Sequence, residues 1–203
     1  MKIPRGVVYM LFPVLVFVAC KNTRPSQDVQ GQEIARVKGD TVFAKSGQYF
    51  VLDSMKKVYY LIRHAEKDTV PKDNPALTAK GNKRATLLAD ILRATRVDAI
   101  YSTFYTRTLF TVDSLADIKA MSIMPYETKD LRKLIDQIQA DDNLKSVVIV
   151  GHSNTTPSLA NSISSKTVFQ KPFDETDYNN FVIVYEKHNG EKDVLSMLYK
   201  IQE

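Results

Sequence analysis

The chain has 203 residues, of which 44% are hydrophobic and 25% are charged, so it is long enough for one globular domain with a full core. Its formal net charge of +5 is not gathered into a basic run or a patch with interleaved aromatic residues, which argues against a nucleic-acid partner. The single cysteine, Cys20, excludes a disulfide framework and a cysteine metal cluster within one chain.

The N-terminus has the pattern of an export signal. Lys2 and Arg5 precede an apolar run from 7 to 19, which is too short for an ordinary membrane-spanning helix. A small residue stands before Cys20 and polar residues follow it, a pattern that resembles the signal of bacterial lipoproteins, in which the cysteine is acylated. We therefore expect a cleaved segment 1–19, a lipidated Cys20 and a domain held in the cell envelope by its lipid. A plain secretory signal or an uncleaved anchor is the alternative.

Residues 20–40 contain few large apolar side chains and many polar ones, which is typical of a tether. We place one domain over 41–203. Its first element is a hairpin, because 41–43 and 49–52 are apolar runs separated by a short polar segment with a glycine.

An apolar run from 58 to 62 predicts a buried strand, and it ends abruptly in Arg63 and His64. A helix is expected from Thr78, which can cap it, to about residue 94. Gly81 in its first turn costs about 1 kcal/mol relative to alanine, so we expect another part of the chain to approach closely there.

The rest of the domain alternates between strand and helix patterns. Strands are expected at 97–101, at 146–150 and, as an edge strand, at 122–125. Helices are expected after a cap at Ser102 and Thr103, around 131–138, and from about 156 to 163. A hairpin is expected to turn at Asn189-Gly190 between 180–186 and 193–200. This order predicts a three-layer α/β/α fold with a mostly parallel central sheet and a C-terminal antiparallel hairpin.

Two of the central strands end in a histidine. His64 follows 58–62 directly, and His152 follows 146–150 after one glycine, so both fall at the carboxyl edge of the sheet, where parallel neighbours would bring them together. Arg107 lies in the first turn of a helix entered from a strand. Two histidines with Arg63 and Arg107 make a pocket for a tetrahedral dianion, because guanidinium groups bind phosphate oxygens in pairs.

These residues resemble a known family, the histidine phosphatase superfamily, which includes cofactor-dependent phosphoglycerate mutases and small phosphohistidine phosphatases. The matching motifs, in the family's order and spacing, are Arg63-His64-Ala65-Glu66, Leu77-Thr78 with Gly81, Tyr101-Ser102 with Thr106-Arg107-Thr108, and Gly151-His152-Ser153. The resemblance implies a phosphoglycerate mutase-like fold with His64 as the nucleophile that forms a phosphohistidine. Arg63, Arg107 and His152 would hold the phosphoryl oxygens, with Ser153 beside them.

The proton donor is implied less directly. In mutase-like members it is a carboxylic acid after the third strand, and Glu127 lies in that region, with Glu66 as a second candidate. Relatives of the acid phosphatase type carry an aspartate after the second histidine, where this chain has Ser153. We expect no cofactor and no metal, because arginines supply the positive charge and no carboxylate cluster is evident.

Three other functions compete with this one. A serine hydrolase is suggested by Gly151-His152-Ser153, although Thr155 replaces the second glycine of that motif and His188, in a predicted turn, is the only later histidine. A mutase would need a larger substrate-covering insertion than the chain offers. A non-catalytic phosphate-binding module would keep the same pocket. We therefore predict a metal-independent phosphatase that acts on a phosphorylated small molecule or a phosphoprotein.

Overall fold

The computed structural model describes residues 30–52 and 55–201; the predicted signal 1–19 and Cys20 lie outside this part of the chain. Its centre is a six-stranded sheet in the order β6-β5-β7-β4-β8-β9. The strands are β4 (Met55–Arg63), β5 (Ala99–Ser102), β6 (Ile123–Pro125), β7 (Ser146–Gly151), β8 (Asn180–Lys187) and β9 (Lys192–Leu198). The helices are α1 (Ala79–Leu92), α2 (Thr106–Lys119), α3 (Leu131–Ala140) and α4 (Thr155–Ser164), with a short 3-10 helix, η2 (Thr128–Asp130), before α3.

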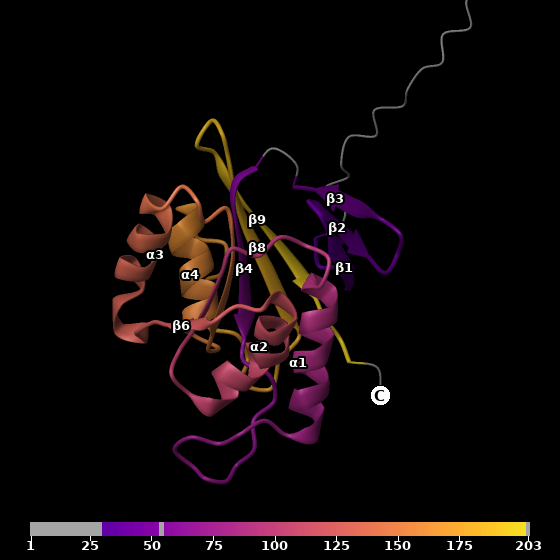
Figure 1. Ribbon diagram of the computed structural model, residues 1–203, viewed down its shortest axis with the longest axis vertical. Helices are drawn as coiled ribbons and strands as arrows, with labels where there is room; N and C mark the ends of the chain where they lie inside the picture. Colours follow the sequence, from indigo (N-terminus) through magenta and orange to yellow (C-terminus); the bar gives the residue numbers. More distant parts are fainter. Residues whose placement is uncertain (1–29, 53–54, 202–203) are drawn as a thin grey trace, which may run out of the picture.

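The predicted three-layer fold is confirmed. Strands β6, β5, β7 and β4 run parallel to one another. Strand β8 pairs antiparallel with β4, and β9 pairs antiparallel with β8. Figure 1 shows α3 and α4 on one side of the sheet and α1 and α2 on the other. The helices found within 30–52 and 55–201 are all too short or too polar to cross a membrane.

Side chains of β4 alternate between the two faces of the sheet and so belong to two different cores. Tyr60 and Ile62 pack with α1 and α2, whereas Tyr59 and Leu61 pack with α3 and α4. Each of these side chains is at most 2% exposed. Burying a large apolar side chain stabilises a fold by about 1.5–3 kcal/mol, so β4 is held firmly from both sides.

Regular structure begins before residue 40, where the predicted tether ends. Strand β1 (Ile34–Lys38) pairs with β2 (Thr41–Ala44), which pairs with β3 (Tyr49–Val51), so the expected hairpin is two strands of a three-stranded antiparallel sheet. Ile34 and Val37 are 1% and 0% exposed and pack into the core on the α1 side. Only two apolar side chains secure β1, which explains why its sequence resembles a tether.

The start of α1 was predicted correctly. The side chain of Thr78 caps the helix by accepting a hydrogen bond of 3.0 Å from the backbone N–H of Gly81. The close approach expected at Gly81 is also present: a Cβ atom there would collide with the backbone carbonyl oxygen of Glu66. Because Glu66 lies two residues after His64, the glycine lets α1 press against the segment that follows the strand end.

We predict that Gly81→Ala destabilises the protein even though alanine favours helices. The added methyl group must displace the backbone at Glu66, and overpacking of this kind costs about 1–3 kcal/mol. Urea unfolding of the variant measures the loss, with Lys83→Ala, an exposed position of the same helix, as the control. Unchanged stability of Gly81→Ala would show that α1 does not depend on this contact.

Candidate active site

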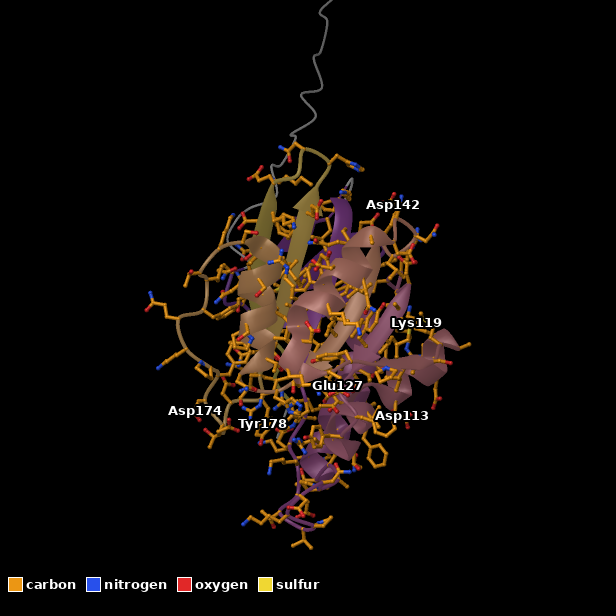
Figure 2. All side chains as sticks on the ribbon, turned by 90° about the vertical axis from the view of Figure 1, so that its left-hand side faces the viewer. Asp113, Lys119, Glu127, Asp142, Asp174 and Tyr178 are labelled. Carbon is orange, nitrogen blue, oxygen red and sulfur yellow. The ribbon has the colours of Figure 1, made fainter. Side chains whose placement is uncertain are left out.

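The two histidines meet at the carboxyl edge of the sheet, as the sequence predicted. Strands β4 and β7 pair in parallel with Arg63 opposite Gly151, so His64 and His152 leave the sheet at the same level. Their rings lie edge to face with centroids 5.5 Å apart. In Figure 2, Glu127, Asp174 and Tyr178 mark this end of the molecule, and Asp142, which precedes β7, marks the opposite end.

Backbone contacts fix which nitrogen of His64 can react. Its Nδ1 lies 2.8 Å from the carbonyl oxygen of Ala65. A carbonyl can only accept, so we assign the proton of the neutral ring to Nδ1, which leaves the lone pair on Nε2. The backbone N–H of His64 donates to the carbonyl of Gly151 at 2.9 Å, and the side chain of His64 is buried. The ring is therefore held as a neutral imidazole with one nucleophilic nitrogen.

The surroundings keep both rings neutral. Burial lowers the pKa of His64 to about 3, and the charges of Arg63 and Arg107 act in the same direction. Burial also lowers the pKa of His152 to about 4, again with help from the two arginines, whereas Glu175 opposes the change. A protonated imidazole has no lone pair, so these shifts preserve nucleophilicity at neutral pH.

The helix expected to start at a Ser102 and Thr103 cap begins later, and this prediction was wrong. Helix α2 starts after Tyr105, which forms no side-chain cap. Thr103 is engaged elsewhere: its hydroxyl lies 3.1 Å from Nε2 of His152 and 2.9 Å from the hydroxyl of Thr108. The threonine that looks like a helix cap is thus a support for the second histidine.

Arg63 is fully buried, with both terminal nitrogens bound to a strap that we define as residues 173–178. Its Nη1 donates to the carbonyl oxygens of Asp174 at 2.6 Å and Asp177 at 2.9 Å. Its Nη2 donates to the carbonyl and the carboxylate of Glu175, at 2.9 and 2.8 Å. The ring of Tyr178 covers the guanidinium at 4.3 Å. These partners offset the cost of burying the charge.

One donor on each arginine stays without a partner. In the part of the chain that the structure describes, the Nε atoms of Arg63 and Arg107 are buried and make no hydrogen bond. Arg107 lies in the first turn of α2, its guanidinium 4.3 Å from the ring centre of Tyr105. An unpaired buried donor costs about 1–3 kcal/mol, so an anion that pairs with both would be bound favourably.

Glu175 is the residue that the sequence reasoning missed. Its carboxylate accepts hydrogen bonds from Arg63 and from the hydroxyl of Ser153, two of the groups predicted to hold the phosphoryl oxygens. The N–H of Phe173 also donates to the carbonyl of Ser153 at 2.9 Å, which fixes the strap on this edge. Glu175 therefore occupies, as an internal anion, donors that a bound phosphate would use.

The two candidate proton donors have different surroundings. Glu66 is bound by Arg84, whose Nε and Nη2 each donate to its carboxylate at 2.8 Å. Burial alone would raise the pKa of Glu66, but the bonds from Arg84 outweigh it and lower the pKa, so Glu66 stays ionised and structural. Arg84 also donates to the carbonyl of Tyr199 at 2.6 Å. Glu127 is exposed and lines a cleft beside Thr103 and Tyr105.

The geometry removes the serine hydrolase alternative. His188 follows β8 in the turn predicted for it, and β8 runs antiparallel to β4 with Lys187 opposite Met55. His188 therefore lies at the amino end of β4, at the opposite edge of the sheet from Ser153. The Ser153 hydroxyl donates to Glu175, and no hydrogen bond within the part of the chain that the structure describes joins it to His64 or His152, so it lacks the activating base that hydrolases use.

Comparisons with known proteins agree with this geometry. A family model described as Histidine phosphatase superfamily (branch 1) matches residues 59–132, which supports the resemblance seen in the motifs. The sequence has no match among curated proteins.

Solved structures of similar fold include the protein histidine phosphatase SixA complexed with tungstate, at 16% identity, TM-score 0.56, 70% of this chain and 96% of that one. A mycobacterial glucosyl-3-phosphoglycerate phosphatase matches with 10% identity and a TM-score of 0.56, and the match covers 71% of this chain and 99% of that one. YhfR of Bacillus stearothermophilus matches with 16% identity and a TM-score of 0.53, and the match covers 68% of this chain and 95% of that one. At such identities the likeness shows a shared fold.

We predict that both histidines stay neutral well below pH 6.5, their ordinary pKa, and take up protons only as the pH falls to about 4 for His152 and about 3 for His64. Saturating inorganic phosphate should raise both pKa values, because a nearby dianion favours the charged ring. Nitrogen-15 NMR titration of the imidazoles measures this. A midpoint near 6.5 in phosphate-free protein, or no response to phosphate, would contradict the proposed site.

Proposed function

We propose that this chain is a phosphatase of the histidine phosphatase type, which hydrolyses phosphomonoesters or phosphohistidine through a phosphohistidine on His64 without a metal. One observation carries the proposal: two neutral imidazoles face each other beside two arginines whose buried Nε donors have no partner. The family match over 59–132 supports the same class. Two of the similarly folded proteins are described as phosphatases, which agrees with it.

The proposed reaction has two steps. In the first, the lone pair of His64 Nε2 attacks phosphorus, the bond from phosphorus to the leaving oxygen breaks, and that oxygen takes a proton from an acid. In the second, water attacks the phosphohistidine, the nitrogen–phosphorus bond breaks, and inorganic phosphate leaves as the acid regains its proton. His64 thus begins and ends each cycle as a neutral imidazole.

Arg63 and Arg107 take the part that metal ions play in other phosphoryl-transfer enzymes. Charge spreads over the equatorial oxygens of the transferring group, and catalysis is mostly positioning and electrostatic stabilisation. The guanidinium of Arg63 is held rigid by the strap, and Thr103 holds His152. Such fixed donors need not reorganise during the reaction.

Glu127 is the carboxylate that best fits the acid. Two other glutamates near this edge are each bound by an arginine: Glu66 by Arg84 and Glu175 by Arg63. Glu127 instead lines the cleft next to Thr103, which bonds His152, so its carboxyl group is placed beside the position of a leaving oxygen.

A phosphatase fits the fold better than a mutase. Between β5 and β7 the chain consists of α2, β6, η2 and α3, joined by short connections. Both helices pack on the sheet, with Val112 and Leu115 of α2 in one core and Leu134 and Ile138 of α3 in the other. No segment between β5 and β7 is left to form a large cover, which a mutase needs to shield its phosphorylated intermediate from water.

The mechanism predicts that His64→Asn lowers the turnover of p-nitrophenyl phosphate, assayed with a metal chelator present, by at least about 10³-fold. Asparagine keeps a polar side chain but cannot form the covalent intermediate. His188→Asn, at the opposite edge of the sheet, is the matched control and should leave turnover unchanged. Near-normal activity of His64→Asn would sink the mechanism.

Replacement of Glu127 and of Glu175 should have different effects. Glu127→Gln should lower kcat by about 10²–10⁴-fold for alkyl phosphates, whose leaving oxygen needs a proton, and much less for p-nitrophenyl phosphate. Glu175→Gln should keep turnover but bind inorganic phosphate several-fold more tightly, because the competing charge is gone. If Glu175→Gln instead shows the dependence on the leaving group, Glu175 is the acid and Glu127 is not.

A further inference from the structure

A cleft of about 590 Å³ opens beside the second histidine and has no role in the chemistry described so far, apart from holding Glu127. It is lined by two segments: 103–105, after β5, and 125–128, which begins at the last residue of β6. Both segments follow the carboxyl ends of parallel strands, so the cleft belongs to the same edge of the sheet as His64.

The lining touches the reacting groups directly. Thr103, one of the lining residues, has its hydroxyl 3.1 Å from Nε2 of His152. The ring of Tyr105 lies edge-on to His152 with centroids 5.4 Å apart, and its face covers the Arg107 guanidinium. A phosphoryl group held by these residues therefore has this cleft next to it, where the leaving group can lie.

Two aromatic rings are presented to whatever enters. Phe104 is 80% exposed and Tyr105 is 41% exposed, although a ring of this size gains free energy when it is covered. Figure 2 places Glu127, of the facing segment, at this end of the molecule. Such uncovered aromatic surface beside a catalytic residue suits stacking against a planar group.

The charge of the lining points the same way. Segments 103–105 and 125–128 contain no lysine or arginine, and their one carboxylate is Glu127. Lys129 and Lys133 line a neighbouring hollow along α3, which shares residues 125–127 with the cleft. The lining of the cleft itself therefore offers no cation to a leaving group that has its own carboxylate or second phosphate, which disfavours such a group.

We propose that this cleft is a leaving-group subsite for a planar aromatic group without negative charge, so that the preferred substrates are phosphate esters of alcohols or phenols that carry an aromatic ring. This rests on the proposed phosphatase function and narrows its substrate class. Phe104 is then a specificity-determining residue, and it takes no part in the chemical steps.

The test compares 2-phenylethyl phosphate with ethyl phosphate, whose leaving alcohols have similar acidity, so that a difference reports binding of the ring. The kcat/KM for the aromatic ester should be larger by about 10-fold, the worth of one good aromatic contact. Phe104→Ala should remove most of this preference and leave ethyl phosphate turnover unchanged. Phe110→Ala, an exposed phenylalanine of α2 outside the cleft, should keep the preference.

Binding of the two corresponding phosphonates, measured by calorimetry, separates this inference from the function on which it rests. If no phosphate ester is hydrolysed but the aromatic phosphonate still binds more tightly in a manner that depends on Phe104, the subsite stands and the phosphatase proposal fails. Hydrolysis of both esters at equal kcat/KM, equal binding of both phosphonates, or a preference that survives Phe104→Ala would overturn the subsite.

Discussion

The site depends on the parallel pairing of β4 with β7. With Arg63 opposite Gly151, the next residue of each strand is a histidine at the same level. A slip of one residue would turn Tyr59 and Leu61 to the wrong core and separate the two rings. Because β4 is buried on both faces, its packing opposes such a slip. The distance between the two imidazoles is thus set by apolar side chains that lie in the two cores, away from the rings themselves.

A buried cation is the second constraint. The guanidinium of Arg63 needs acceptors at the end of a central strand, and the strap supplies them from residues more than 100 positions later. Satisfying the two terminal nitrogens leaves Nε as the free donor. The same contacts that make the charge tolerable in the core therefore fix the guanidinium in place with one donor unpaired.

Features encoded by neighbouring residues could be predicted from the sequence. The buried runs at 58–62 and 146–150, the cap at Thr78, the close approach at Gly81 and the turn at Asn189-Gly190 all carry local signals, and they were found. The meeting of the two histidines followed from one general rule on parallel sheets.

Features that arise from distant contacts could not be predicted. Nothing near Glu175 in the sequence indicates that it lies between Arg63 and Ser153, and Thr103 looks like a helix cap because its partner, His152, is 49 residues away. Strand β1 was missed because only Ile34 and Val37 secure it. Glu66 seemed available for catalysis only while Arg84 was not known to hold it.

Arg84 links Glu66, which follows the first histidine closely, to a residue near the end of the fold. Arg84 binds Glu66 on one side and the carbonyl of Tyr199 on the other, and Tyr199 is fully buried. Strand β8, which flanks β4, also comes late in the sequence. A chain that ends just after His152 contains both histidines and both arginines, but it lacks β8, and Arg84 has no Tyr199 to bind. The arrangement of these four side chains is therefore complete only after β8 has paired with β4 and Tyr199 has docked beside Arg84.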